Sequence, residues 1–281
     1  MKLPTIKLPK IHIARPNLHL GRPSARRLIL TIRRRKIAVA CGILAVAAIF
    51  YVVTNPAVVG VSATKRELPI YSVQRDNRAV SLTFDAAWGN EDTQMLIDIL
   101  GKYNVHATFF VVGAWAEKYP ESVRALSEAG HEVMSHSNDH AHFTKLSPDQ
   151  IVANISASNE KIAKVTGHTP TLFRAPYGEY DDRVITTVRG MGMNVIQWDV
   201  DSLDWKEISA KEITQRVTSK VAPGSIVLFH NSALHTPEAL PSIIEYLIRD
   251  GYAIVPVSEL LLRGEYSVNY TIDHAGRMIA K

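Results

Sequence analysis

The residue types with the clearest chemical potential are two histidines and two possible proton carriers. His136 and His140 are four residues apart, a spacing that puts both imidazoles on one face of a helical turn and suits a divalent metal. Such pairs are frequent by chance, so their surroundings decide between a metal site and a structural role. Asp85 and His230 each follow a short apolar run and could act as general base and general acid. Together these four residues predict a site that activates water.

Arg174 and a group of aspartates add charge to this set. Arg174 ends an apolar run, so it is either buried against an anion such as Asp85 or exposed at the start of a loop. One of three closely spaced aspartates could charge the imidazole of His230, although such clusters also occur in solvated loops and calcium sites. These are Asp199, Asp201 and Asp204. No serine or cysteine has the surroundings of a nucleophile elbow, which favours water as the nucleophile.

The elements that position these residues alternate between short β-branched runs and helical stretches from about residue 75 onward. This alternation predicts parallel strands joined by crossover helices. Seven strands are predicted, at Val80–Phe84, Thr108–Val112, Glu132–Ser135, Leu172–Arg174, Asn194–Trp198, Ser225–Phe229 and Ala253–Val257. One helix has strong signals at both ends, because Ser147 and Gln150 form a capping box and Gly167 suits its last turn.

Seven strand–helix units in one chain predict an α/β fold of the irregular (β/α)7-barrel type, with an open doubly wound sheet as the alternative. In both architectures the carboxyl ends of parallel strands share one face. The ionisable residues follow the predicted strands directly, so they are expected to converge there. This convergence is the main argument from the residues themselves for an enzyme.

The charge of the chain is distributed unevenly. The formal net charge is +5, yet residues 1–36 hold eleven of the 32 Lys and Arg residues and none of the 27 Asp and Glu residues. The remainder therefore carries 21 basic residues against 27 acidic ones. An acidic body excludes a partner that is bound through a phosphate backbone, so no nucleic-acid partner is expected.

An uncharged run from Ile37 to Ala63 follows four consecutive basic residues. Its most apolar part, Ile37 to Val53, is near the lower limit of roughly 17 to 25 residues for a spanning helix. With the basic flank inside, the sequence predicts a single-pass protein of the cytoplasmic membrane with its body outside, or a cleaved signal peptide as the alternative. The expected organisation is a basic cytoplasmic segment (1–36), a transmembrane anchor (37–59), a linker (60–74), a catalytic domain (75–265) and a C-terminal tail (266–281).

Five segments, taken in order, resemble the motifs of the polysaccharide deacetylase family, also called the NodB-homology family or carbohydrate esterase family 4. The first two are Thr83-Phe84-Asp85 and His136-Ser137-Asn138-Asp139-His140. The others are Arg174-Ala175-Pro176-Tyr177-Gly178, Asp201-Ser202-Leu203-Asp204-Trp205 and Leu228-Phe229-His230. The resemblance covers about residues 75 to 265 and implies an irregular barrel of the (β/α) type.

The resemblance implies a role for each catalytic residue. Asp85 would be the general base, held by Arg174, and His230 would be the general acid, tuned by Asp201. The implied reaction is hydrolysis of the N-acetyl amide of a peptidoglycan sugar, either N-acetylglucosamine or N-acetylmuramic acid, through a tetrahedral intermediate. No obligate protein partner is evident.

The resemblance also implies residues that hold a metal and the substrate. His136 and His140 would bind a divalent metal such as Zn²⁺ or Co²⁺. The main-chain N–H of Tyr177 would help to stabilise the oxyanion. Trp205 and Leu228 would wall the pocket that receives the acetyl methyl group.

Position 86 departs from the family pattern. The first motif normally has two consecutive aspartates, the second of which completes an Asp-His-His metal triad, whereas this chain has Ala86 after Asp85. Each missing ligand weakens a metal site. Asp85 itself could bind the metal, a nearby carboxylate could substitute (Asp139, Glu91 or Asp92), or the metal could be dispensable. The same change followed by Trp-Gly resembles the PdaB-like subgroup associated with sporulation.

Two hypotheses other than an active deacetylase follow from this departure. The chain would be a weakly active or non-catalytic homologue that binds glycan without hydrolysing it, if loss of the second aspartate removes the metal. Alternatively, it would be a membrane scaffold for spore assembly, in which case Asp85 and His230 would be dispensable.

Overall fold

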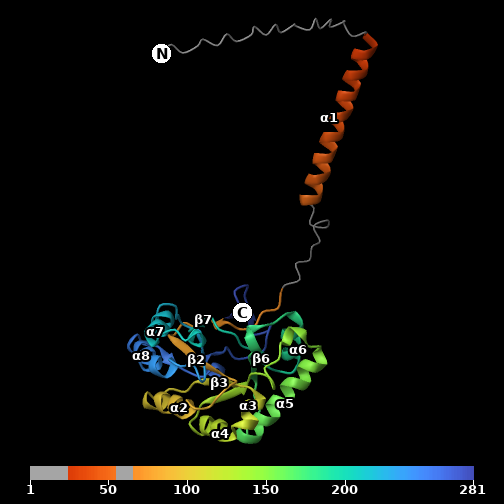
Figure 1. Cartoon of the computed structure of the whole chain (residues 1–281). Helices are drawn as coiled ribbons and strands as arrows, with labels where there is room; N and C mark the ends of the chain where they lie inside the picture. The colour runs from red at the N-terminus through yellow and green to blue at the C-terminus, as the bar shows by residue number, and fades with distance from the viewer. Residues whose placement is uncertain (1–24, 55–65) are drawn as a thin grey trace, which may run out of the picture. The chain divides into compact units, whose positions relative to one another are not determined.

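The computed structural model describes residues 25–54 and 66–281 (Figure 1). These residues fall into two compact units, of which the first contains helix α1 (Ala25–Thr54) and the second contains all later elements. Residues 1–24 of the predicted cytoplasmic segment, 55–59 of the predicted anchor and 60–65 of the predicted linker lie outside the described residues.

Helix α1 does not meet the requirements for crossing a membrane. Within the described part of the chain, no helix combines sufficient length with sufficient apolar character. Helix α1 includes the four basic residues 33–36. On this finding the predicted transmembrane anchor, and the location in the cytoplasmic membrane derived from it, are wrong.

The second unit consists of short strands and the helices that connect them. Its strands are β1 (Ser72–Val73), β2 (Ala79–Ala86), β3 (Thr108–Val111), β4 (Glu132–Ser135), β5 (Leu172–Phe173), β6 (Asn194–Val195), β7 (Val200–Asp201), β8 (Ile226–His230), β9 (Ala253–Ile254), β10 (Tyr270–Ile272) and β11 (Arg277–Ala280). Its α-helices are α2 (Thr93–Lys102), α3 (Gly113–Lys118), α4 (Pro120–Glu128), α5 (Pro148–Thr166), α6 (Asp182–Gly190), α7 (Ala210–Thr218), α8 (Thr236–Arg249) and α9 (Val257–Leu260). Three 3₁₀ turns are η1 (Phe143–Lys145), η2 (Pro176–Gly178) and η3 (Asp204–Lys206).

The main sheet is parallel and curled, in the order β6-β5-β4-β3-β2-β8-β7, with β9 paired to β2. All seven predicted strands are present, and β7 is an additional one. The described pairings do not join β6 to β7, so the sheet is a half-barrel rather than a closed barrel. The α/β fold is therefore confirmed, while the complete (β/α)7 barrel is only partly formed. The strands at and next to the two ends of this sheet, β5, β6 and β7, have only two residues each.

The predicted ends of helix α5 are confirmed. Ser147 accepts a hydrogen bond from the Gln150 main chain, and the Gln150 side chain accepts one from the Ser147 main chain. Gly167 follows the helix at φ 76°, a left-handed conformation that glycine adopts without strain. Helix α5 packs behind β4 and thereby supports the loop that carries the two histidines.

Strand β2 separates an apolar layer from a polar interior. Leu82, Phe84 and Ala86 belong to the cluster between the sheet and helices α2, α4, α7 and α8. The alternate residues Thr83 and Asp85 face the other side, where both contact the buried Arg174. Because successive side chains of a strand point to opposite faces, this alternation aims Asp85 into the barrel.

Three phenylalanines fix the register of the central strands. Phe84 lies opposite both Phe109 of β3 and Phe229 of β8. Its ring stacks on theirs at centroid distances of 4.7 and 5.4 Å. A slip of one residue would turn every side chain of β2 to the opposite face, so this stack also fixes the direction of Asp85.

A second, smaller sheet has the order β1-β11-β10. Strand β11 pairs in parallel with β1 and antiparallel with β10. An apolar cluster that includes Val73, Ile272 and Met278 lies against it and also contains Phe110 of the main sheet. Residues of the predicted linker and of the predicted tail therefore share one sheet and one apolar cluster.

His131, at the start of β4, makes the stability of the fold sensitive to acid. Its ring is buried, its Nδ1 accepts a hydrogen bond from the Ala107 main chain, and its Nε2 has no partner. Burial, together with the neighbouring His106, lowers the pKa of His131 to about 4. The unfolded chain binds a proton near pH 6.5, so the stability linked to His131 is complete above that pH. It is lost progressively as the pH falls from about 6.5 to about 4.

We therefore expect His131→Asn, which retains an acceptor for Ala107, to reduce the loss of stability in acid. The wild-type chain should lose about 2 kcal/mol more than the variant between pH 7.5 and pH 5. Thermal unfolding at the two pH values measures the difference. Substitution of the exposed His168 by Asn is the matched control and should leave the acid sensitivity unchanged. Equal losses in the wild-type and His131→Asn chains would contradict the assignment.

Candidate active site

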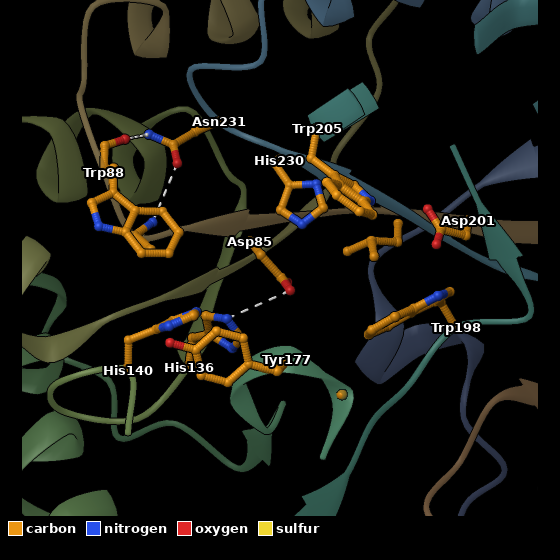
Figure 2. Close-up of a pocket in the computed structure, with 13 residues that line it drawn as sticks. Asp85, Trp88, His136, His140, Tyr177, Trp198, Asp201, Trp205, His230 and Asn231 are labelled. Atoms are coloured by element: carbon orange, nitrogen blue, oxygen red, sulfur yellow. Dashed lines mark hydrogen bonds and ion pairs between the residues drawn. The ribbon is translucent and has the colours of Figure 1, made fainter. Parts of the chain in front are cut away.

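A cavity of about 500 Å³ opens where the central strands end (Figure 2). Eight of the nine predicted site residues line it, and the ninth, Arg174, is completely buried beside Asp85. The lining residues are Asp85, Ala87, Trp88, His136, His140, Tyr177, Gly178, Trp198, Asp201, Trp205, Leu228, His230 and Asn231. The structure therefore brings the predicted residues together, as expected for groups that follow parallel strands.

Asp85 and Arg174 form a buried ion pair. Arg174 Nη1 donates to Asp85 Oδ1 at 2.8 Å and to Thr83 Oγ1 at 2.9 Å, and its Nη2 donates to the Gln197 carbonyl at 3.1 Å. The guanidinium also lies 4.1 Å from the Phe110 ring centroid. Burial alone would raise the pKa of Asp85, but Arg174, His136 and His230 outweigh it and lower that pKa. Asp85 is therefore a carboxylate at neutral pH.

The two histidines of the second motif adopt different roles in the hydrogen-bond network. The Arg174 carbonyl accepts a hydrogen bond from His136 Nδ1 at 2.8 Å, which leaves His136 Nε2 facing Asp85 Oδ2 at 3.6 Å. The rings of His136 and His140 are 5.1 Å apart, and His140 Nδ1 is buried without a partner. Burial, with His136 nearby, lowers the pKa of His140 to about 4. Burial also lowers the pKa of His136. Both imidazoles are therefore neutral at neutral pH.

The donor set is incomplete for the predicted Zn²⁺ or Co²⁺. Among the described residues, no group of three His, Cys, Asp or Glu side chains could hold a metal ion. Ala86 is part of the apolar core, and Asp85 already neutralises Arg174. Two imidazoles without a third protein ligand give a weak site. The three-ligand metal centre therefore does not fit this chain.

The carboxylates that were considered as substitutes are engaged elsewhere. Asp139 accepts hydrogen bonds from the Asn154 amide and the Ala141 main chain. Asp92 accepts one from the Ser232 main chain, and Glu91 accepts one from the Asn90 main chain. None of the three lines the cavity with the histidines.

The partner of His230 is Asp204 rather than Asp201. Asp204 Oδ1 lies 2.8 Å from His230 Nδ1, while its Oδ2 accepts hydrogen bonds from the His230 main chain and from Thr236 Oγ1. Burial would lower the pKa of His230, but its hydrogen bond to Asp204 and the charge of that residue raise it. Asp204 thus favours the protonated form of His230, which is the form that can donate a proton.

The sequence resemblance implied that Asp201 tunes His230, and the charge of Asp201 does raise the pKa of that imidazole, but less than Asp204 does. The Asp201 carboxylate lines the cavity, and its Oδ1 accepts a hydrogen bond from the main chain of Leu203 at 2.8 Å. Leu203 has a positive φ of 57°, and this turn brings Asp204 beneath His230. The sequence around the three aspartates does not show which of them contacts His230. That choice depends on the left-handed backbone conformation of Leu203, which residue types alone do not predict.

Aromatic side chains form the rim of the cavity. Tyr177 and Trp205, both predicted, are more than half exposed, and Leu228 is buried between β7 and the pocket. Trp198 and Trp88 also line the cavity but were not predicted as site residues. Trp198 lies just beyond β6, and Trp88 lies just beyond β2. Other site residues also follow strands, so this position could have identified both tryptophans from the sequence.

Comparison with known proteins agrees with this geometry. The polysaccharide deacetylase family model matches residues 72–196. The peptidoglycan-N-acetylmuramic acid deacetylase PdaC of Bacillus subtilis is 35% identical over 189 residues, which are 67% of this chain but 40% of PdaC. The chain thus spans about two fifths of the length of that relative.

Two further similarities cover more of the matched protein. The peptidoglycan-N-acetylmuramic acid deacetylase PdaA of Bacillus subtilis is 30% identical over 192 residues, covering 67% of this chain and 73% of PdaA. The crystal structure of a carbohydrate esterase family 4 pseudoenzyme from Bacillus anthracis matches with 35% identity and a TM-score of 0.66, covering 68% of each chain. This chain therefore belongs to the polysaccharide deacetylase family.

Proposed function

We propose that this protein hydrolyses the N-acetyl amide of sugars in cell-wall glycan. The observation that carries the proposal is the register of β2 and β8, in which Asp85 and His230 lie directly opposite each other. A carboxylate and a charged imidazole on adjacent strands can act on the two sides of one scissile amide. The names of the relatives support peptidoglycan as the substrate, with N-acetylmuramic acid or N-acetylglucosamine as the sugar.

The proposed chemistry is a direct attack by water. Asp85 accepts a proton from a water molecule while the water oxygen bonds to the acyl carbon. A tetrahedral intermediate forms. His230 then donates a proton to the sugar nitrogen as the C–N bond breaks, which releases acetate and a free amine. Arg174 keeps Asp85 ionised, and Asp204 keeps His230 charged. Because Asp85 has a lowered pKa, it is a weak base, and slow turnover is expected.

The remaining residues would bind and orient the acyl group. We assign the acetyl methyl group to the apolar side of the cavity, where Leu228 and Trp205 line the wall. The main-chain N–H of Tyr177 would donate to the developing oxyanion. Tyr177 has a positive φ of 60°, a strained conformation that often marks a functional position.

Acetate release tests the proposed function. The full chain should release acetate from peptidoglycan or from N-acetylglucosamine oligomers, and the free amines should appear in equal amount. The assay is run with EDTA and separately with added Zn²⁺, Co²⁺, Mn²⁺ or Ni²⁺, together with metal analysis of the purified protein. Absence of acetate under every condition would refute hydrolysis.

A second candidate function is glycan binding without hydrolysis. The incomplete metal donor set favours it, and one similar structure is that of a pseudoenzyme, of which a mutant has restored enzymatic activity. In this case the chain should sediment with insoluble peptidoglycan and release no acetate. Ala86→Asp would then create metal-dependent acetate release, whereas in an active parent it should change mainly the response to metal. A role in sporulation, implied by the PdaB-like sequence of the first motif, is part of the proposal and is tested by deletion in a spore former.

A further inference from the structure

Trp88 is a large aromatic side chain that the fold holds in contact with solvent. Its side chain is 65% exposed although it lines the cavity. One edge contacts the His140 ring at a centroid distance of 4.7 Å, and the planes are tilted by 63°. An exposed indole at the edge of a pocket offers a large, flat apolar face on which a ligand can pack. Trp88 has no role in the proposed reaction.

The loop that carries Trp88 is fixed by several hydrogen bonds to its main chain. Asn231 Nδ2 donates to the carbonyls of Trp88 and Gly89, at 2.7 and 2.9 Å, and Asn231 Oδ1 accepts from the Ala87 main chain at 3.2 Å. Ser232 Oγ also donates to the Trp88 carbonyl at 3.1 Å. Asn231 is nearly buried, so it is a rigid clamp rather than a surface contact.

Gly89 is required for this clamp to close. It has a φ of 59°, and a Cβ atom placed there would meet Ser232 Oγ at 2.4 Å. Trp115 Nε1 also donates to the Gly89 carbonyl. The loop is thus held by the two residues that follow β8 and by Trp115 of α3, so little conformational entropy is lost when a ligand covers the indole.

Trp88 lies across the cavity from the acyl side. Figure 2 shows Trp88 and Asn231 on one side of Asp85, and Trp198, Trp205 and Asp201 on the other. A sugar whose acyl group points toward Trp205 therefore has its ring near Asp85 and His230. The unit linked to that sugar would then lie over the indole of Trp88.

We propose that Trp88 is the platform for a sugar unit adjacent to the one that is hydrolysed, and that Asn231 positions it. The proposal rests on the proposed function for the class of ligand, an N-acetylated glycan of at least two units. The apolar C–H face of a pyranose ring packs on the indole, which offers a large area with few rotatable bonds. Asn231 acts through the loop rather than on the reacting atoms.

The test is binding of N-acetylglucosamine tetramer and monomer to the full chain by isothermal titration calorimetry. Trp88→Ala should weaken tetramer binding at least about tenfold, the size of an interface hot spot, and leave monomer binding within about twofold. Trp88→Phe, which retains an aromatic face, should stay within about threefold of the wild type for both ligands. Ile248→Ala, at an exposed apolar position on α8, is the matched control and should change neither value.

Each contrary outcome overturns the proposal in a recognisable way. Wild-type affinity of Trp88→Ala for the tetramer excludes the platform. Equal losses for tetramer and monomer assign Trp88 to the reacting sugar instead, and a wild-type chain that does not bind the tetramer excludes this ligand class. Tetramer binding that depends on Trp88 without any acetate release leaves the platform intact and refutes the hydrolysis alone.

The positioning role of Asn231 is tested by a double-mutant cycle. Asn231→Ala should weaken tetramer binding, and combining it with Trp88→Ala should weaken it no further than Trp88→Ala alone. Asn231→Asp retains the acceptor for Ala87 but places a carboxylate oxygen against the Trp88 and Gly89 carbonyls, so it should weaken tetramer binding at least as much as Asn231→Ala. Additive losses would show that Asn231 contacts the glycan itself and would overturn its role through Trp88. Circular dichroism establishes that each variant is folded.

Discussion

Asp85→Asn should abolish acetate release and also destabilise the protein. Removing the base is expected to reduce the rate by at least about 10²-fold. The variant also leaves the Arg174 guanidinium buried without a counter-charge, and breaking a buried pair costs about 3–5 kcal/mol. In a unit of this size the melting temperature should fall by roughly 10 °C. Acetate assays and thermal unfolding measure the two effects separately.

Two variants separate catalysis from stability at this pair. Thr83→Val removes one hydrogen bond from Arg174 and one to the Val227 carbonyl, so it should cost about 1–3 kcal/mol while activity is largely retained. Asp85→Leu combined with Arg174→Met replaces the pair by apolar groups, so it should recover stability relative to Asp85→Asn but remain inactive. Substantial acetate release by Asp85→Asn would show that another group is the base.

Asp204→Asn should produce the second large effect, a loss of activity that depends on pH. The amide can still accept the His230 hydrogen bond, but it carries no charge, so the pKa of His230 should fall. The rate at neutral pH should decrease by about 10²-fold or more, as for the loss of a general acid. Acetate release measured across pH 5–9 tests this expectation.

The direction of the pH shift follows from the protonation states. His230 must be protonated, so the rate falls as the pH rises through its raised pKa, and in Asp204→Asn this decline should begin at lower pH. Asp85 must be ionised, so the acid limb should lie below the usual range of a carboxyl group and should not move. The stability that His230 contributes is complete below its unfolded pKa of about 6.5 and is lost as the pH rises through the folded value.

Asp201→Asn provides the matched control, because Asp201 lines the same cavity without contacting the His230 ring. The charge of Asp201 raises the pKa of His230 less than Asp204 does, so we expect the pH profile of Asp201→Asn to shift less than that of Asp204→Asn and its rate to remain within about threefold. A profile shifted by Asp201→Asn and unchanged by Asp204→Asn would contradict the assignment of the partner and favour the role that the sequence resemblance implied.

The sequence was informative where a local rule determines the structure. The alternation of β-branched runs with capped helices predicted seven strands, and all seven are present. The same reasoning placed Asp85, His136 and His230 at strand ends, where they line one cavity. The sequence did not predict β7, because a strand of two residues has no recognisable propensity signal of its own.

Features that depend on tertiary geometry could not be read from residue types. The choice between Asp201 and Asp204 depends on a single left-handed residue, Leu203. The clamp on Trp88 depends on Asn231, which is 143 residues away in the chain. The apolar run after Lys36 likewise suggested a spanning segment, but no helix in the described ranges meets the requirements for one.

The small sheet of β1, β11 and β10 determines when the unit can be completed during synthesis. Met278 and Ile272 pack in the apolar cluster that contains Phe110, and Arg174, which orients Asp85, rests on the Phe110 ring. Strand β11 therefore supports Asp85, the base of the proposed reaction, through Phe110 and Arg174. Contacts of such long sequence separation form late. During synthesis on the ribosome, most strands would therefore form before the Asp85 carboxylate is fixed in its position.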